Sequence, residues 1–296
     1  VGPHGWFRVD EIDITTHCKP GVNAVAIEVA GYNLDSFYVL DQPSFLQAEV
    51  LAGERVLAAT GGAAFKAAVL DYKVQKVQRY SHQRVSSEVY RLTAASEAWR
   101  IKGLRKPVRC AVVKGGRLLP RGVAYPDFSL CQPDRLMARG ELACGEFTGD
   151  RKGALMLTWA HQKNFPEQDL DCTPSLELYA LREKSRDTAA VAFEPQAAVR
   201  LRTLQFAQYD FGTAQCGFLG ATVECRRRTR LAFYFSELLI EDDVRDRDAD
   251  GANLISYELE PGTYALESFE PYLARVLKMI VLEGDCDIRA PFLRRY

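Results

Sequence analysis

The chain consists mainly of short runs in which apolar and polar residues alternate, rich in β-branched and aromatic side chains and separated by turn residues. This period of two predicts half-buried strands rather than helices. One example is 22–29, entered through Lys19-Pro20-Gly21, where Pro presets φ and Gly tolerates a positive φ. The other predicted strands are 44–51, 56–59, 65–69, 87–92, 108–113, 155–159, 176–181, 199–206, 218–223, 231–235, 254–259, 263–269 and 276–282. This number of strands is larger than one ordinary sandwich contains, so we expect an all-β chain with two β-sandwich modules.

Two interruptions divide this pattern. Residues 104–139 contain four prolines with several Gly and Arg, which favours a long irregular surface connection. Residues 184–195 are charged and end in Pro195, as expected at a module boundary. We therefore predict one module at 1–193, with a loop-rich insertion around 104–139, and a second at 194–296. Helix is expected only as short turns near 94–99 and 236–242.

Composition and charge exclude several classes of protein. The hydrophobic fraction of 47% supplies enough apolar surface for packed cores. Lys and Arg number 38 against 39 Asp and Glu, so the basic surface that nucleic acids require is not expected. No apolar run approaches the roughly 18 residues that a membrane-spanning helix needs. We expect neither nucleic acid nor a membrane as a partner.

Two stretches near the end resemble a known family. Tyr209-Asp210-Phe211-Gly212, then Gly217-Phe218-Leu219-Gly220 and residues 229–239, resemble the β-sandwich that precedes the catalytic barrel of bacterial α-L-rhamnosidases. Residues 257–272 resemble that family's following hairpin, with Glu260-Pro261-Gly262-Thr263 as its turn. These residues also have structural explanations, because Asp210 can accept bonds from backbone amides and Gly212 and Gly217 permit a tight strand crossing. We expect a scaffold role for Asp210.

The amino-terminal part has a second resemblance. Residues 6–30 have the form W-x-R-x-x-x-x-D-[IV]-T … K-P-G-x-N-x-[VI]-A-[VI], similar to a sugar-binding jelly roll found before the catalytic domains of many glycoside hydrolases. The chain opens with Val1 rather than Met, so we expect this galactose-binding-like jelly roll to be truncated at its start. The compartment stays unknown: the cytoplasm is slightly favoured, and the periplasm or secretion would follow from a removed signal peptide.

The resemblance implies a region without its own catalytic residues. In that family an acid and a base act across the glycosidic bond from a downstream (α/α) barrel, and an inverting mechanism needs them about 6.5 to 9.5 Å apart. The sequence has no long amphipathic helices to build a barrel, and no D-x-P-x-R-x-E signature. We therefore expect an accessory region that binds a rhamnose-containing glycan, packs against the catalytic domain of its parent, or both. The alternatives are purely structural sandwiches, or a separate enzyme with an unrecognised site in 104–193.

Candidate sugar contacts lie near the start of the chain. Sugars are held by aromatic faces and by polar side chains that bond their hydroxyls. Tyr32, Asn33 and Tyr38 combine these types in a predicted loop, and Trp6 is a further candidate. Core packing is the alternative interpretation for all four.

No cofactor and no metal are predicted. Residues 246–251 match the first half of a calcium-binding loop, but Tyr257 stands where the bidentate Glu belongs, so a solvated acidic loop is favoured. Arg226-Arg227-Arg228 is expected at a solvated hairpin tip rather than in a binding patch. The four His are widely spaced, and the eight Cys are expected to be mostly buried thiols, with one or two disulfides as the alternative.

Overall fold

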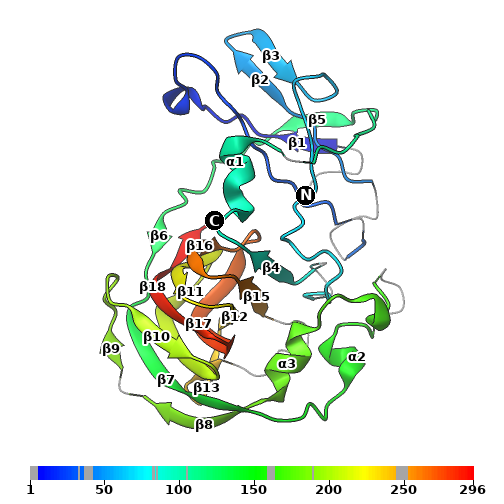
Figure 1. The fold of residues 1–296 in the computed structure, drawn as a ribbon. Helices are drawn as coiled ribbons and strands as arrows, with labels where there is room; N and C mark the ends of the chain where they lie inside the picture. The colour runs from blue at the N-terminus through cyan, green and yellow to red at the C-terminus, as the bar shows by residue number, and fades with distance from the viewer. Residues whose placement is uncertain are drawn as a thin grey trace. The chain divides into compact units, whose positions relative to one another are not determined.

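The computed structural model describes residues 6–32, 34–36, 43–81, 84, 86–104, 106–158, 164–188, 190–244 and 253–296 (Figure 1). The strands are β1 (Trp6–Val9), β2 (Glu49–Ala52), β3 (Arg55–Ala59), β4 (Glu88–Leu92), β5 (Arg117–Pro120), β6 (Leu130–Cys131), β7 (Arg135–Cys144), β8 (Leu181–Asp187), β9 (Val191–Ala192), β10 (Val199–Arg202), β11 (Gln205–Cys225), β12 (Thr229–Ser236), β13 (Leu239–Ile240), β14 (Asp243–Val244), β15 (Leu254–Leu259), β16 (Gly262–Glu267), β17 (Tyr272–Glu283) and β18 (Asp285–Arg295). The helices are α1 (Trp99–Lys102), α2 (Arg151–Ala154) and α3 (Pro174–Ala180), with 3₁₀ turns at Thr15–His17, Ser96–Ala98 and Glu167–Asp169. The predicted all-β class is confirmed.

The chain forms two compact units. Unit 1 comprises Val1–Asn33, Asp41–Asp71 and Glu97–Tyr125, and unit 2 comprises Leu34–Leu40, Tyr72–Ser96 and Pro126–Tyr296. The predicted boundary near residue 193 does not coincide with this division, because β7 and β8, before it, are hydrogen-bonded into the same sheet as β11, after it. The division of this chain into modules at 1–193 and 194–296 stays a prediction.

Unit 1 contains little regular structure. Its strands are the parallel pair β1 and β5 and the hairpin of β2 and β3. The strand predicted over 22–29 does not form, and Val25, Ile27 and Val29 are exposed along it. Alternation alone therefore did not produce a strand here, since a strand also needs a neighbour to take its backbone bonds.

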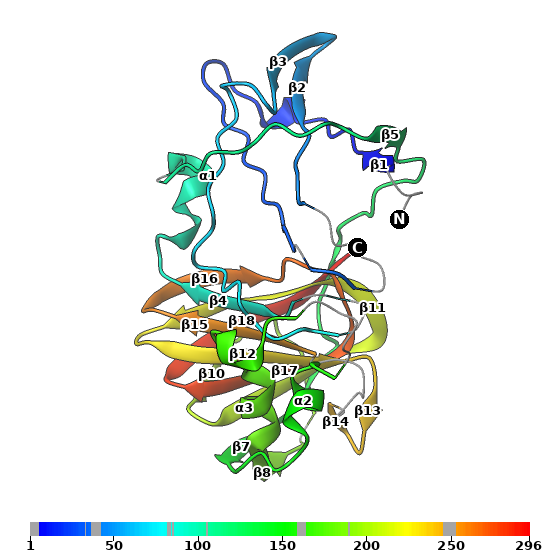
Figure 2. The same ribbon diagram turned by 90° about the vertical axis from the view of Figure 1, so that its right-hand side faces the viewer.

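Unit 2 is a β-sandwich organised around the long strand β11. The first half of β11 pairs with β17 on one side and with β7 on the other. Beyond β17 the sheet continues through β12 and β15 to β4. Its second half pairs with β18 and β16, and β10 continues that sheet beyond β18. Pairing with β7 ends at Asp210, and pairing with β17 shifts register between Asp210 and Gln215 and then continues to Gly217. Pairing with β18 begins at Gly217 and pairing with β16 at Gly220. Figure 2 shows the strands of unit 2 lying in layers, with β11 curving between them.

Two glycines permit this bend. Gly212 has φ of +78°, and a Cβ there would collide with the Asp134 carboxylate. A Cβ at Gly217 would collide with the backbone carbonyl of Arg294 on β18. The close approaches at both glycines agree with their predicted role in a tight crossing. The predicted hairpin at 257–272 does not form: the chain turns between β15 and β16, but β15 pairs with β12 and β4, whereas β16 pairs with β11.

The core of unit 2 is filled by large side chains from several strands. The fully buried members include Phe206, Leu219, Leu231, Phe233, Phe235, Ile255 and Leu277. Each such side chain contributes roughly 1.5 to 3 kcal/mol by leaving water. These strands were predicted, because their apolar positions repeat with the period of a sheet.

Several other predictions were wrong. Residues 176–181 were expected to be a strand but lie mostly in α3, which begins at Pro174, where a fixed φ suits the first turn. The 104–139 stretch was expected to be an irregular connection, yet it contains β5 and β6 and enters β7. Helices α2 and α3 pack beside each other in unit 2.

Candidate functional site

A groove of about 400 Å³ opens on unit 2, beside the first half of β11. Its walls come from β7, from β8 and β9, from the segment leading into β10, and from β11. The lining residues are Leu136, Ala138, Arg139, Asp187, Val191, Ala192, Phe193, Glu194, Ala197, Val199 and Tyr209. Most of these side chains are apolar, with three charged ones among them, which is the usual character of a small-molecule site.

Tyr209 is the polar group buried deepest in this groove. The residue is 1% exposed, and its hydroxyl has no hydrogen-bond partner within the part of the chain that the structure describes. Phe193 packs edge-on against its ring, with centroids 6.2 Å apart and planes at 87°. Burial raises the pKa of the Tyr209 phenol well above its usual value, so it remains a neutral hydroxyl at physiological pH.

An unpaired buried hydroxyl is costly. Leaving such a group without a partner costs about 1 to 3 kcal/mol, and a ligand hydroxyl or a water molecule in the groove would recover part of that cost. A phenol can donate and accept, so it suits a hydroxylated ligand.

The charged residues of the groove are exposed. Arg139 on β7 lies opposite Asp187 on β8, and Glu194 follows β9. These groups can bond ligand hydroxyls from the solvent side, while Leu136, Val199 and Phe193 offer apolar surface. A general acid of a glycosidase typically lies in a desolvated position, and the exposure of Asp187 and Glu194 therefore favours binding over acid catalysis.

Asp210, the next residue of β11, fixes the strand behind the groove. Its side chain is 3% exposed and accepts bonds from Arg275, from Arg135 and from the Gly212 amide at 2.8 to 3.2 Å. Burial alone would raise the pKa of Asp210, but the bonds from Arg275, Gly212 and Arg135 outweigh it and hold the pKa below its usual value. The expected scaffold role agrees with these contacts.

The sugar contacts predicted from the sequence are only partly described. Trp6 lies on β1 of unit 1, half-buried, with the Arg117 guanidinium 5.2 Å from its ring centroid. Tyr32 is half-buried in the same unit. Asn33 and Tyr38 lie outside the described residues. Trp6 thus contacts Arg117, and no ring contact between Trp6 and Tyr32 is seen among the described residues. Sugar binding by these four residues stays a prediction.

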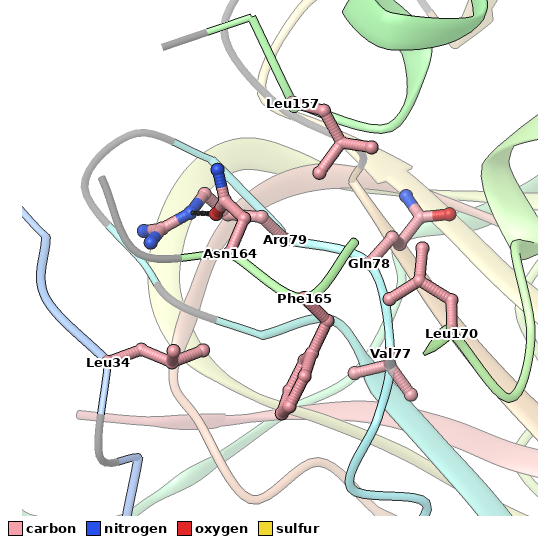
Figure 3. Close-up of a pocket in the computed structure, with 8 residues that line it drawn as sticks. All are labelled: Leu34, Val77, Gln78, Arg79, Leu157, Asn164, Phe165 and Leu170. Atoms are coloured by element: carbon pink, nitrogen blue, oxygen red, sulfur yellow. Dashed lines mark hydrogen bonds between the residues drawn. The ribbon is translucent and has the colours of Figure 1, made fainter. Parts of the chain in front are cut away.

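A second, much smaller pocket lies elsewhere in unit 2, with a volume of about 10 Å³ (Figure 3). The Arg79 Nε donates to the Asn164 side chain at 2.7 Å, and an Nη donates to the Asp35 carbonyl at 2.7 Å. The side-chain oxygen Oε1 of Gln78 accepts hydrogen bonds from the backbone N–H and the hydroxyl of Ser175. The buried side-chain nitrogen Nε2 of Gln78 has no partner among the described residues. This pocket has room for about one water molecule.

The remaining sequence candidates do not form a site. Each arginine of the 226–228 run pairs with an acid, Asp287, Asp285 or Glu258, as expected for a solvated turn. Among the described residues no group of three or more His, Cys, Asp or Glu could hold a metal ion, and the calcium-loop-like 246–251 stretch lies outside them. No described helix is long and apolar enough to cross a membrane.

The sequence did not predict the groove. Tyr209 was noted only as part of a motif, and its unpaired hydroxyl depends on neighbours far away in the chain, such as Phe193. Tyr209 lies between the predicted strands 199–206 and 218–223, so neither its burial nor the cavity beside it was predicted.

The comparisons with known proteins concern the fold. No family model matches the chain, and no curated protein matches it in sequence. Among solved structures it is similar to the GH78 family rhamnosidase of Bacillus sp. GL1, with a TM-score of 0.57 at 14% identity, over 88% of this chain and 45% of that one. A rhamnosidase from Klebsiella oxytoca with rhamnose bound matches at 14% identity over 56% of this chain and 30% of that one, but its TM-score of 0.29 is too low for an argument about fold. The likeness to a rhamnosidase is thus confirmed at the level of the fold: this chain folds like part of the Bacillus enzyme and spans about half its length.

Proposed function

We propose that this chain is a non-catalytic β-sandwich region of an α-L-rhamnosidase-like glycoside hydrolase, and that the Tyr209 groove binds a carbohydrate. The fold likeness to part of a GH78 rhamnosidase supports the first statement. The observation that carries the second is the unpartnered Tyr209 hydroxyl in a groove with both apolar and charged walls.

The chemistry of the groove favours a deoxy sugar such as rhamnose. A sugar presents C–H faces and, in a 6-deoxyhexose, a methyl group, which can pack on Leu136, Val199 and Phe193. Its hydroxyls can bond Tyr209 inside the groove and the charged side chains at its mouth. A groove of about 400 Å³ is within the range of small-ligand sites.

Calorimetric titration tests this proposal. We expect binding heat with L-rhamnose or rhamnose-containing oligosaccharides at millimolar concentration. Ala197→Trp, which fills the groove, should abolish the heat, whereas the matched control Ala214→Trp, at an exposed position outside the lining, should not. No heat with any of these sugars, or equal heat in both variants, would reject the groove as the site.

A structural role is the second candidate, favoured by exposed aromatic residues on unit 2. Tyr296 is 55% exposed and packs against Phe218 and Phe128, with ring centroids 5.6 and 6.4 Å apart. Leu130 nearby on β6 is 57% exposed. Such a patch is suited to burial against a catalytic domain.

An assay of hydrolysis separates both candidates from a stand-alone enzyme. We expect no release of p-nitrophenol from p-nitrophenyl-α-L-rhamnoside by the purified chain. Release that is lost in Asp187→Asn or Glu194→Gln would show that the two groove carboxylates perform the chemistry and would overturn the non-catalytic assignment.

A further inference from the structure

Two cysteines lie opposite each other where β11 and β18 meet. Cys225 is the last residue of β11 and is the register partner of Cys286, the second residue of β18. Side chains of directly opposed residues point to the same face of an antiparallel pair, with Cβ atoms about 4.5 to 5.5 Å apart. A disulfide needs a Cβ separation of about 3.5 to 4.5 Å, so a small approach of the strands suffices.

The two thiols lie close enough for each to shift the pKa of the other. The Thr229 hydroxyl donates to the Arg227 and Asp285 carbonyls. Both cysteines are buried, at 3% and 2% exposure. All eight cysteines are free in this structure, and four of the others are exposed.

The register also separates this pair from the other strand cysteines. Cys131, Cys144 and Cys216 are opposite leucines, namely Leu293, Leu181 and Leu273. Cys225 and Cys286 are thus the cysteines that the strand pairing aligns with each other.

We propose that Cys225 and Cys286 are the site of a cross-strand disulfide, formed by exchange with a small-molecule disulfide such as oxidised glutathione. One cysteine thiolate attacks the small disulfide, forms a mixed disulfide and releases one small thiol. The second cysteine then attacks the protein sulfur of that mixed disulfide and releases the second small thiol. The two cysteines are oxidised, the small disulfide is reduced, and the two cysteine protons end on the two released thiols.

The surroundings determine when this exchange occurs. The neighbouring Cys225 and burial raise the pKa of the Cys286 thiol, whereas the neighbouring Cys286 lowers the pKa of Cys225. Both cysteines are buried, which limits the access of a small disulfide in the folded chain. Exchange should therefore take place mainly while the strands are forming, or when the end of β11 opens.

Refolding of the full chain with oxidised glutathione tests the proposal. Cys216 shares the tryptic fragment 203–226 with Cys225, so the experiment uses a Cys216→Ser background. We expect mass spectrometry to find fragments 203–226 and 279–289 linked, two hydrogens lighter than their sum, and the urea midpoint to rise relative to the reduced chain. Adding Cys286→Ser should remove both the link and the rise.

Two results would overturn it. One is that Cys225 and Cys286 remain open to alkylation after oxidative refolding, measured in urea. The other is that either is found joined to a different cysteine or to glutathione. Should the serine variant fail to fold, the fragment map of the Cys216→Ser chain alone decides between these outcomes and the expected link.

Discussion

Asp210 offers the sharpest test of how unit 2 is held together. Replacement by Asn keeps the shape and an acceptor for the Gly212 amide, but removes the negative charge that faces Arg275 and Arg135. Removing one member of a buried ion pair costs about 3 to 5 kcal/mol. Here the arginines are 34% and 47% exposed and can recover hydration, so we expect about 2 kcal/mol for Asp210→Asn.

The pH dependence distinguishes charge from packing. Because the pKa of Asp210 is lower in the folded than in the unfolded chain, its contribution to stability is present above the unfolded pKa of about 3.9. It is lost as the pH falls from there through the folded pKa. The free energy of unfolding of Asp210→Asn should therefore differ from the parent fully at pH 7 and progressively less below about pH 4.

Urea denaturation followed by circular dichroism measures both effects. Asp169→Asn, at an exposed position in unit 2, is the matched control and should change the free energy of unfolding by less than about 0.5 kcal/mol. A loss in Asp210→Asn that is equally large at pH 3 and pH 7 would refute the reasoning, since a packing defect does not depend on the carboxylate charge.

Three further predictions follow from contacts already described. Tyr209→Phe should weaken carbohydrate binding about fivefold in calorimetry, because the ligand loses its bond to the hydroxyl. The same variant should raise the free energy of unfolding of the free chain by about 1 kcal/mol, because it has no unpaired hydroxyl, and a fall in stability would contradict this. Gly217→Ala should lower the free energy of unfolding by about 2 kcal/mol or more, since its Cβ meets the Arg294 carbonyl. An unchanged urea midpoint would show that β11 and β18 can move apart at this point. The Cys225–Cys286 disulfide closes a loop of about 60 residues and should add about 4 kcal/mol of stability in denaturant titrations, with no gain on oxidation contradicting it.

The sequence predicted the carboxyl-terminal part of the fold better than the amino-terminal part. Strands β12, β15 and β17 have dense runs of alternating apolar residues that are paired on both sides, so local pattern and tertiary structure agree. In unit 1 the same alternation over 22–29 found no neighbouring strand, and its apolar residues are exposed. Whether a run becomes a strand depends on non-local pairing, which alternation cannot reveal.

One predicted strand failed for a local reason. Apolar residues at 176 and 178 fit a strand locally, yet Pro174 starts a helix there, in which Glu177 forms an ion pair with Arg230.

The candidate site was harder to predict than the fold. The groove depends on how β9 and the residues after it approach Tyr209, a distance in space that no spacing in the sequence encodes. The residues chosen for sugar contact were selected by type alone, and type does not determine exposure.

The shared strand has a consequence for how unit 2 folds. At about 3.3 Å per residue β11 would measure roughly 70 Å if straight, so its bend makes one strand serve two sheets. Its partners begin near residue 135 and end near residue 295, so the chain must close loops of very different length before either sheet has all its neighbours. Such high contact order predicts slow folding, and because a defect in one half of β11 disturbs its other half, the two layers should melt in a single cooperative transition.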